Sequence, residues 1–376
     1  MRIGYDAKRI FYNRGGLGNY GRNTIFYLSK HIKNHEYYLY TPSLRKAINF
    51  DLNGNMENVT IKTPPLILQG PFKSVWRTRN MVPQLGRDKI EIYHGLSNEL
   101  PLSIQRKKNI KTIVTIHDLI FLRYPQFYKD LDRWTYKKKF LFSSEIADTI
   151  VAVSKQTQQD LIEFYKISPQ KIRVVYQGCD QLYFENRKQV ELEAVREKFN
   201  LPQNFILSVG TIEERKNLLT VVRTLFHKRI DIPLVAVGQR TEYTEKVREY
   251  VKRRKMDNRV IMIHNASNYE LSCIYRMASM TIYPSFFEGF GIPVIESLAA
   301  GVPVITSKGT CLREAGGDAA WYVNPGSMEE IGHAILTISN DSDKKTEMIE
   351  KGFQHVRKFT GENVARNLNR IYNYMK

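Results

Sequence analysis

Cysteine is scarce in this sequence, and the three that occur are far apart. Cys179, Cys273 and Cys311 form no CxxC pair, so the sequence favours neither a disulfide framework nor a zinc site and fits a reducing compartment. Long apolar runs are missing too, since none approaches the roughly 18 residues of a membrane span. The first residues, MRIGYDAKRI, enter a strand-like pattern with no secretory signal. We therefore expect a cytoplasmic protein.

Acidic residues are also few. Asp and Glu number 38 against 57 Lys and Arg, which gives a formal net charge of +19. Most of this excess lies in residues 1–180, which hold 29 Lys and Arg against 15 Asp and Glu. A basic half indicates an anionic partner, such as a phosphate group, a nucleic acid or an acidic membrane face, although a solvated basic surface has the same composition.

Motifs for metals and nucleic acids are missing as well. The sequence has no HExxH and no histidine spacing typical of a metal site. The acidic triplets at 130–132 and 341–343 lie in polar segments. The aromatic residues that follow KKK at 137–139 have the spacing of core residues rather than that of a nucleic-acid surface. We expect no metal, no cofactor and no nucleic-acid partner.

What the sequence does have is short β-rich runs that alternate with helix-like segments, as in parallel sheets covered by helices on both faces. One series begins with a strand over residues 3–10, and a second begins at NFILSVG. We predict an α/β protein with domains over 1–180 and 181–358, joined by a polar seam without strands near 178–200. A terminal helix over 359–376 should return to the first domain.

Two loops, one rich in glycine and one basic, directly follow predicted strands. Ligands of open parallel sheets bind at such positions. Gly15 and Gly16 precede a helix, whose N-terminal N–H groups favour a phosphate. A tight turn that needs positive φ is the alternative. Arg215 and Lys216 follow Gly210 and should open a helix, where two cations oppose the helix dipole and suit a diphosphate. A solvated surface pair is the alternative.

Two carboxylates stand in an apolar stretch, SFFEGFGIPVIESLAAGVPVIT, with no basic residue beside them. We expect a helix from Ile292 or Pro293 and place Glu296 on the exposed side of its first turn. A carboxylate can accept two hydrogen bonds from a vicinal diol, so Glu288 and Glu296 can hold two diols of one long ligand. A helix-dipole role is the alternative for Glu296. No partner acid of a glycosidase pair stands near Glu288.

A histidine follows another predicted strand. In TIVTIHDLIFLRYP, His117 could donate to a substrate hydroxyl or titrate near neutrality. A structural histidine bonded to a backbone carbonyl is the alternative. His94 has a similar place and a weaker case.

Together these stretches resemble a known family. EGFGIPVIE resembles the E-x7-E signature of retaining GT-B glycosyltransferases of the family-4 type. GGLGNYGRN, TIHDLIFLRYP, SVGTIEERKNL and LREAGGDAAWYVNP resemble further landmarks of that family, in the family's order. The resemblance covers nearly the whole chain. It implies two Rossmann-like domains that face each other across a cleft.

The resemblance also implies roles for the residues in these stretches. The donor would be a nucleotide-diphosphate sugar held mainly by the second domain, and the family usually needs no metal. Arg215 and Lys216 match the diphosphate-binding pair, Glu296 matches the acid on the ribose, and His117 matches the histidine at the reacting face of the sugar. Glu288 matches the acid beside the donor sugar, where Gly289, Phe290 and Gly291 would offer backbone N–H groups to the sugar hydroxyls. Gly15 and Gly16 match the front loop that approaches the phosphates, and Gly210 would also lie at the donor. Ala266 should lie near the base, whose identity stays open because IHNASNYEL departs from the family pattern.

The function that the resemblance implies is sugar transfer with anomeric retention. HDL…RYP and LREAGGDAA look most like mannosyltransferases, so we expect GDP-mannose, with UDP-glucose and UDP-N-acetylglucosamine open. The acceptor should be a glycan or lipid-linked glycan in surface polysaccharide synthesis. The basic clusters at 106–108 and 137–139 should dock on the anionic inner membrane face. A nucleotide-sugar epimerase of GT-B shape and a nucleic-acid-binding protein are the alternatives.

Overall fold

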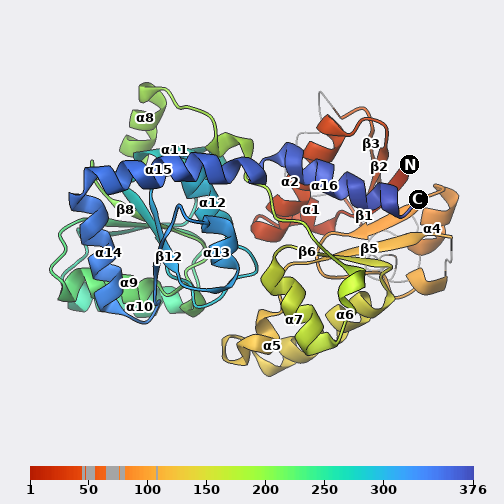
Figure 1. The fold of residues 1–376 in the computed structure, drawn as a ribbon, viewed down its shortest axis with the longest axis horizontal. Coiled ribbons are helices and arrows are strands. Elements are labelled where there is room, and N and C mark those ends of the chain that lie inside the picture. The colour runs from red at the N-terminus through yellow and green to blue at the C-terminus, as the bar shows by residue number, and fades with distance from the viewer. Residues whose placement is uncertain (45–46, 48–55, 65–75, 77–80, 107–108) are drawn as a thin grey trace. The chain divides into compact units, whose positions relative to one another are not determined.

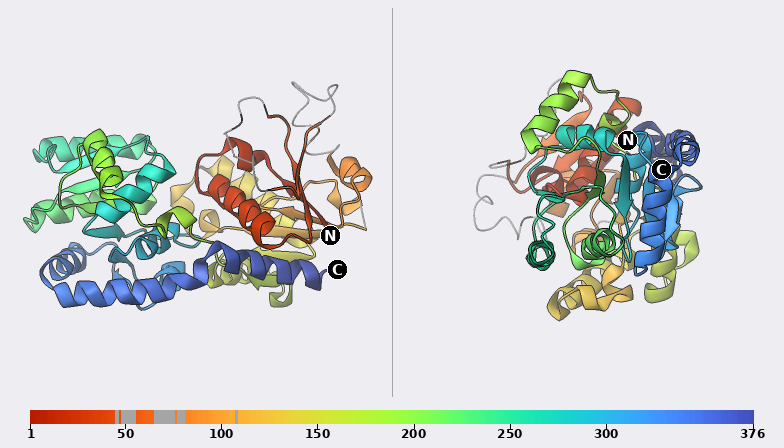
Figure 2. Two further views of the ribbon diagram at one scale, coloured as in Figure 1. Left: turned by 90° about the horizontal axis from the view of Figure 1, so that it is seen from above. Right: turned by 90° about the vertical axis from the view of Figure 1, so that its left-hand side faces the viewer.

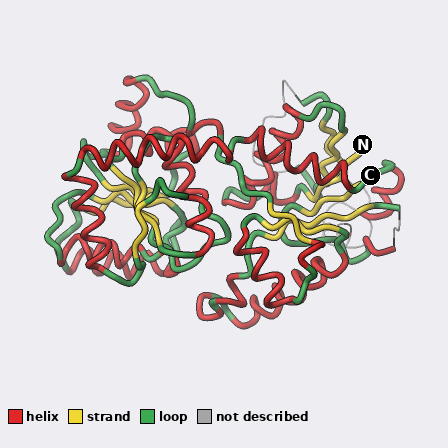
Figure 3. The backbone as a smooth tube through the Cα atoms, viewed as in Figure 1, coloured by secondary structure: helices red, strands yellow, loops and turns green. Residues whose placement is uncertain are grey.

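A computed structural model describes the chain except for residues 45–46, 48–55, 65–75, 77–80 and 107–108. The described residues form two compact units. The first contains residues 1–178 and 361–376, and the second contains residues 179–360. Each unit has strands at its centre and helices outside them (Figure 3).

The first unit contains a parallel sheet. Its described strands follow the order β3-β2-β1-β4-β5-β6-β7. They are β1 (Arg2–Asp6), β2 (Glu36–Tyr40), β3 (Val59–Lys62), β4 (Ile92–Gly95), β5 (Lys111–Ile116), β6 (Thr149–Ala152) and β7 (Ile172–Val174). Its described helices are α1 (Lys8–Tyr12), α2 (Gly16–His31), α4 (Met81–Arg87), α5 (Ile120–Arg123), α6 (Asp130–Ile146), α7 (Lys155–Tyr165) and α16 (Gly361–Tyr374).

Side chains of this sheet alternate between two cores, as the pleat of a strand requires. On β6, Val151 packs with α2 and α16, whereas Ile150 and Ala152 pack with α6 and α7. Helices therefore cover both faces (Figure 1). Both chain ends lie close together in this unit, as Figure 2 shows, because α16 packs on α2 beside β1.

The second unit repeats the design. Its described strands follow the order β10-β9-β8-β11-β12-β13, all parallel. They are β8 (Ile206–Val209), β9 (Leu234–Val237), β10 (Val260–Ile263), β11 (Met280–Tyr283), β12 (Val304–Ser307) and β13 (Trp321–Val323). The helices are α8 (Gln189–Phe199), α9 (Leu218–His227), α10 (Glu242–Arg253), α11 (Asn268–Met277), α12 (Ile292–Ala299), α13 (Thr310–Gly316), α14 (Met328–Asn340) and α15 (Ser342–Val356).

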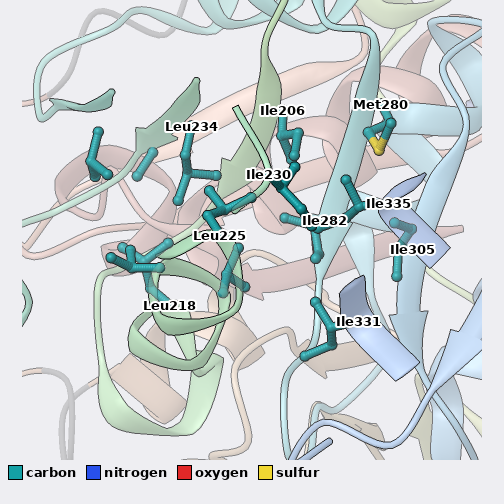
Figure 4. Packing of buried hydrophobic residues seen from close by; sticks show 14 of the residues in the cluster. Ile206, Leu218, Leu225, Ile230, Leu234, Met280, Ile282, Ile305, Ile331 and Ile335 are labelled. Carbon is teal, nitrogen blue, oxygen red and sulfur yellow. The ribbon is translucent and has the colours of Figure 1, made fainter. Parts of the chain in front are cut away.

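One face of this second sheet carries a large aliphatic core. Leu218 and Leu225 of α9 and Ile331 and Ile335 of α14 pack on the strands, with Ile282 of β11 near the centre (Figure 4). Burying a side chain of this kind contributes about 1.5–3 kcal/mol, so the core fixes the strand ends from which the loops of the site leave.

The structure corrects several expected elements. The first strand ends at Asp6, and residues 8–12 form α1 instead of continuing it. The polar seam contains α8, a helix that we did not predict. The strands β3 and β13 were also missed. In each case the segment is short or mostly polar, so its hydrophobic periodicity is weak.

A buried polar network links α16 to the first sheet. The Tyr372 hydroxyl lies 2.9 Å from His94 Nδ1, and His94 Nε2 lies 2.8 Å from Thr115 Oγ1. Tyr5 donates to the Tyr372 hydroxyl at 3.1 Å. Burial lowers the pKa of His94 to about 3, so the ring is neutral and bridges two hydroxyls. His94 is therefore part of the packing of the C-terminal helix.

Candidate active site

The candidate site in the second unit lies where the strand order of its sheet reverses. β8 and β11 are adjacent in the sheet but far apart in sequence, and ligands of open α/β sheets bind beyond the carboxyl ends of strands at such a point. The loop after β8 spans 210–217, and the loop after β11 spans 284–291. These two loops contain most of the residues that we predicted for this unit.

The two loops are held together through their backbones. Phe286 N–H donates to the carbonyl of Arg215 at 2.9 Å. The buried Asn217 amide donates to the carbonyls of Pro284 at 3.3 Å and Pro325 at 2.6 Å. Asn217 does so from a left-handed backbone with φ of 64°, a conformation that asparagine adopts more readily than most residues. These contacts join the two loops within the protein itself.

Glu288 is buried between the loops and has a counter-ion. Arg215 Nη1 lies 2.7 Å from Glu288 Oε2. The same guanidinium pairs with Glu213 at 2.5 Å and donates to the Phe287 carbonyl. The local sequence gives Glu288 no basic neighbour, but the fold supplies Arg215 from the other loop. Removing one partner of a buried ion pair typically costs about 3–5 kcal/mol, so this contact can hold the loop in place.

The Glu288 carboxylate has further partners on its other oxygen. Tyr283 and Ser285 donate to Oε1 at 2.7 and 2.8 Å, and Lys216 Nζ lies 3.7 Å from it. Burial by itself would raise the pKa of Glu288, but Arg215, Lys216 and the hydrogen bond from Tyr283 outweigh it and lower the pKa to about 2. Glu288 is therefore an anion and a hydrogen-bond acceptor at neutral pH.

Lys216 lies over a glycine at the end of β8. A Cβ atom on Gly210 would come within 2.6 Å of Lys216 Nζ, so the ammonium occupies space that any other residue at 210 would restrict. Lys216 donates to the Tyr283 hydroxyl at 2.9 Å. Our expectation that Arg215 and Lys216 open a helix was wrong. They end a short 3-10 turn (Glu214–Lys216), and α9 begins at Leu218.

Glu296 is placed differently from our expectation. It lies in the second turn of α12 and is half-buried, too far along the helix for a first-turn dipole role. Its Oε2 accepts from the Tyr275 hydroxyl at 2.9 Å. Burial, with a smaller contribution from the charge of Asp180, raises the pKa of Glu296 to about 7. Unlike Glu288, it has no cation within ion-pair distance among the described residues.

The remaining predicted residues of this unit lie on loops around the same edge. Gly291 has φ of +130°, and a Cβ there would lie 2.9 Å from Leu312, so glycine is required. Phe290 is buried against Phe359, and Gly289 is half-buried between Glu288 and Phe290. Ala266 is half-buried in the loop before α11.

In the first unit, the glycine loop does not need positive φ. Gly15 has φ of −86°, and Gly16 begins α2. A Cβ on Gly16 would meet nothing within 4 Å, whereas one on Gly18 would lie 1.8 Å from the Asn13 carbonyl oxygen. Packing within this unit therefore explains Gly18 and leaves Gly16 unexplained. The predicted phosphate contact at Gly15 and Gly16 stays a prediction.

His117 follows β5 and is buried with both ring nitrogens engaged. Nε2 lies 2.8 Å from the Leu96 carbonyl, and Nδ1 lies 3.0 Å from Gln177 Nε2. A carbonyl only accepts, so Nε2 carries the proton. Burial lowers the pKa of His117 to about 4, although the Leu96 carbonyl opposes this, so it does not titrate near neutrality. Donation to a substrate hydroxyl would require the Leu96 contact to break.

Sequence reasoning missed several residues that shape the site. Tyr283 is the last residue of β11, and Asn217 directly follows the basic pair, so their positions in the sequence were usable signals. Tyr275 comes from α11 and contacts Glu296 only through the fold, so no local pattern marks it. Among the described residues, no group of three or more His, Cys, Asp or Glu side chains is arranged to hold a metal ion.

Family models match both halves of the chain. Residues 14–181 match the model described as Glycosyltransferase Family 4. Residues 190–355 match the model described as Glycosyl transferases group 1. The boundary between the two matches lies close to the boundary between the two units.

Named relatives and solved structures agree with these models. O-antigen chain mannosyltransferase B from Escherichia coli is 27% identical over 81% of this chain and 79% of its own length. O-antigen chain mannosyltransferase RfbU from Salmonella typhimurium is 26% identical over 61% of each chain. The Anabaena Alr3699/HepE structure in complex with UDP-glucose superposes over 100% of both chains with a TM-score of 0.78 and 15% identity. Sucrose-phosphate synthase from Thermosynechococcus elongatus gives 0.78 and 19%, covering 100% of this chain and 99% of its own. At such identities the structural likeness concerns the fold.

The raised pKa of Glu296 predicts a pH-dependent stability. The folded state binds this proton more tightly than the unfolded chain, so stability should fall as pH rises from about 4.5 to about 7. Glu296→Gln cannot ionise and should lack this component, worth at most about 3 kcal/mol. We expect the thermal midpoint of wild type to drop relative to the variant across this window, with exposed Glu249→Gln as the control. Parallel pH profiles for wild type and Glu296→Gln would contradict the assignment.

Proposed function

This chain is a GT-B glycosyltransferase of the group 1 and family 4 kind, and on that premise we propose that it transfers a sugar from a nucleoside-diphosphate donor to a hydroxyl of a glycan acceptor with retention of anomeric configuration. The proposal depends mainly on one observation, the Lys216 ammonium beside an ionised Glu288 at the strand-order reversal. A cation there suits a diphosphate, and a fixed carboxylate suits sugar hydroxyls.

Within this proposal the adjacent cations have different tasks. Arg215 is already paired with Glu213 and Glu288, so it fixes the carboxylate and adds positive charge to the site. Lys216 has three N–H donors and gives one to Tyr283. Lys216 therefore is the residue that we assign to the leaving diphosphate. The acceptor oxygen attacks the anomeric carbon on the face from which the diphosphate departs, and a diphosphate oxygen takes the acceptor proton.

For the donor sugar we propose mannose, supplied as GDP-mannose. The two relatives described above are named mannosyltransferases of O-antigen chains. UDP-sugars remain the alternative, since the Anabaena structure was determined in complex with UDP-glucose. His264 ties the end of β10 to the Gly238 carbonyl through Nδ1 at 2.8 Å, beside the Ala266 loop that we assign to the base. We propose that no metal is needed and that the acceptor is a glycan or lipid-linked glycan in surface polysaccharide synthesis.

We also propose that the first unit contacts an anionic membrane face through α6. None of the helices in the described part of the chain combines the length and hydrophobicity that a bilayer crossing requires. On α6, Leu131 is 76% exposed and Trp134 is 58% exposed. Lys138 Nζ lies 3.8 Å from the centre of the Trp134 ring. Leu131, Trp134 and Lys138 share one helix stripe, and Trp with Lys is typical of membrane–water interfaces.

The basic residues that we predicted for docking are only partly described. Residues 107–108 of the 106–108 cluster lie outside the described residues. Lys137, Lys138 and Lys139 are exposed on α6, although Lys139 also pairs with Glu99 at 3.5 Å. Each such cation near an anionic surface is worth about 1 kcal/mol.

Lys216→Met tests the proposed function. Wild type should be stabilised by GDP or GDP-mannose, by about 2.7 kcal/mol at 100 times the dissociation constant. The variant should lose most of this stabilisation and about 100-fold or more of turnover, with little change in its stability without ligand. Lys228→Met, which removes a half-exposed cation of the same unit, is the control.

Thermal shifts with GDP, UDP, GDP-mannose, UDP-glucose and UDP-N-acetylglucosamine check ligand binding, and analysis of products with donor alone separates transfer from epimerisation. Equal nucleotide binding by wild type and Lys216→Met would contradict the role of Lys216. Conversion of the donor to its epimer without an acceptor would contradict glycosyl transfer.

Sedimentation with lipid vesicles tests the α6 surface. Wild type should bind phosphatidylcholine vesicles that contain phosphatidylglycerol at low salt, because lysines meet anionic headgroups and Trp134 enters the interface. Leu131→Ser with Trp134→Ser, and separately Lys137→Glu with Lys138→Glu, should each weaken binding. Val190→Ser on α8, at a residue that is 67% exposed, should not. Equal sedimentation of wild type with neutral and anionic vesicles would contradict the proposed membrane contact.

A further inference from the structure

Tyr283 lies between the two oppositely charged side chains that we assign to the donor. Its buried hydroxyl, at the end of β11, donates to Glu288 Oε1 at 2.7 Å and accepts from Lys216 Nζ at 2.9 Å. The direct distance from Lys216 Nζ to Glu288 Oε1 is 3.7 Å, beyond the usual 2.7–3.2 Å of an N–H···O hydrogen bond. The phenol therefore bridges two ions that do not bond to each other directly.

The Lys216 ammonium is bordered by Gly210, Tyr283 and Glu288. The open backbone of Gly210 borders it on one side, where a Cβ would come within 2.6 Å. The Tyr283 hydroxyl meets it at 2.9 Å, and the centre of the same ring lies 5.1 Å from Nζ. Without the phenol oxygen, a small shift would bring the ammonium into hydrogen-bond distance of Glu288 Oε1, which lies 3.7 Å away. A direct ion pair there would join two ionised groups, whereas the present bond joins the ammonium to a neutral phenol.

We propose that Tyr283 is a positioning residue, a spacer that keeps Lys216 from collapsing onto Glu288 and so leaves its other N–H groups directed to a nucleoside diphosphate. The identity of the ligand rests on the proposed function. The separation of Lys216 from Glu288 by Tyr283 does not depend on that function. Glu288 does not need a direct hydrogen bond from Lys216, because Arg215 and Ser285 already bind its two oxygens. The hydroxyl of Tyr283 thus keeps the Glu288 anion and the Lys216 cation apart, so that each can bind a different part of the donor.

Tyr283→Phe tests the spacer, since it removes the hydroxyl and keeps the ring. A crystal structure of the ligand-free variant should show Lys216 Nζ within hydrogen-bond distance of Glu288. Lys216 still separated from Glu288 in that structure would overturn the proposal. This result does not depend on any donor, so it distinguishes failure of the spacer from failure of the proposed function.

Calorimetric titration with GDP and UDP tests the consequence for the ligand. Tyr283→Phe should bind the nucleotide that wild type binds about 10- to 100-fold more weakly, by analogy with metal sites, where loss of a partner that orients a ligand costs this much. Added to Lys216→Met, the same change should have almost no further effect, because it acts through the ammonium. Tyr322→Phe, which removes a hydroxyl that donates to the Gly317 carbonyl at 2.6 Å, should bind as wild type does.

A full additional loss in the double variant would show that Tyr283 does not act through Lys216 and would overturn the proposal. Unchanged nucleotide affinity in Tyr283→Phe would overturn it as well. If wild type binds neither GDP nor UDP, the proposed function fails, and the crystal structure of Tyr283→Phe still decides the spacer.

Discussion

The buried ion pair between Arg215 and Glu288 is the interaction on which the second unit's site depends. A carboxylate without a counter-ion would not stay charged in this position, because burial opposes ionisation. Arg215 arrives from the loop after β8 and Glu288 from the loop after β11, so the pair joins two strand ends that the sheet makes neighbours. Backbone bonds from Phe286 and the amide of Asn217 reinforce the join. The groups that hold the site together therefore belong to the protein itself, as electrostatic preorganisation requires.

The two predicted carboxylates differ because their surroundings differ. Glu288 is surrounded by donors and cations, and its pKa falls to about 2. Around Glu296, burial and the charge of Asp180 outweigh the hydrogen bond from Tyr275, and the pKa rises to about 7. One group is thus a permanent anion, while the other can gain or lose a proton near neutral pH. If Glu296 holds the donor's ribose, as the family resemblance implies, it would accept hydrogen bonds most strongly when ionised, and nucleotide affinity would then depend on pH.

Much of the fold could be predicted from the sequence, because its core strands are short runs of β-branched residues bounded by glycine or polar loops. The positions of Arg215, Lys216, Glu288 and Glu296 near one sheet edge also followed, since strand ends predict where loops gather. Their contacts did not. The pairing of Arg215 with Glu288 joins residues 73 positions apart and depends on β8 lying next to β11, which no local pattern encodes. The half-buried place of Glu296 depends on Tyr275 from another helix, and the two engaged nitrogens of His117 depend on Leu96 and Gln177.

Carbon-13 NMR of glutamate side chains, with Glu288→Gln to identify the signal, tests the central ion pair most directly. The carboxyl of Glu288 should stay ionised in a titration from pH 7 down to pH 4, because its pKa of about 2 lies well below the ordinary 4.5. A signal that titrates with a midpoint at 4.5 or above would show that Arg215 does not hold Glu288 as a buried anion, and would contradict the account of the site.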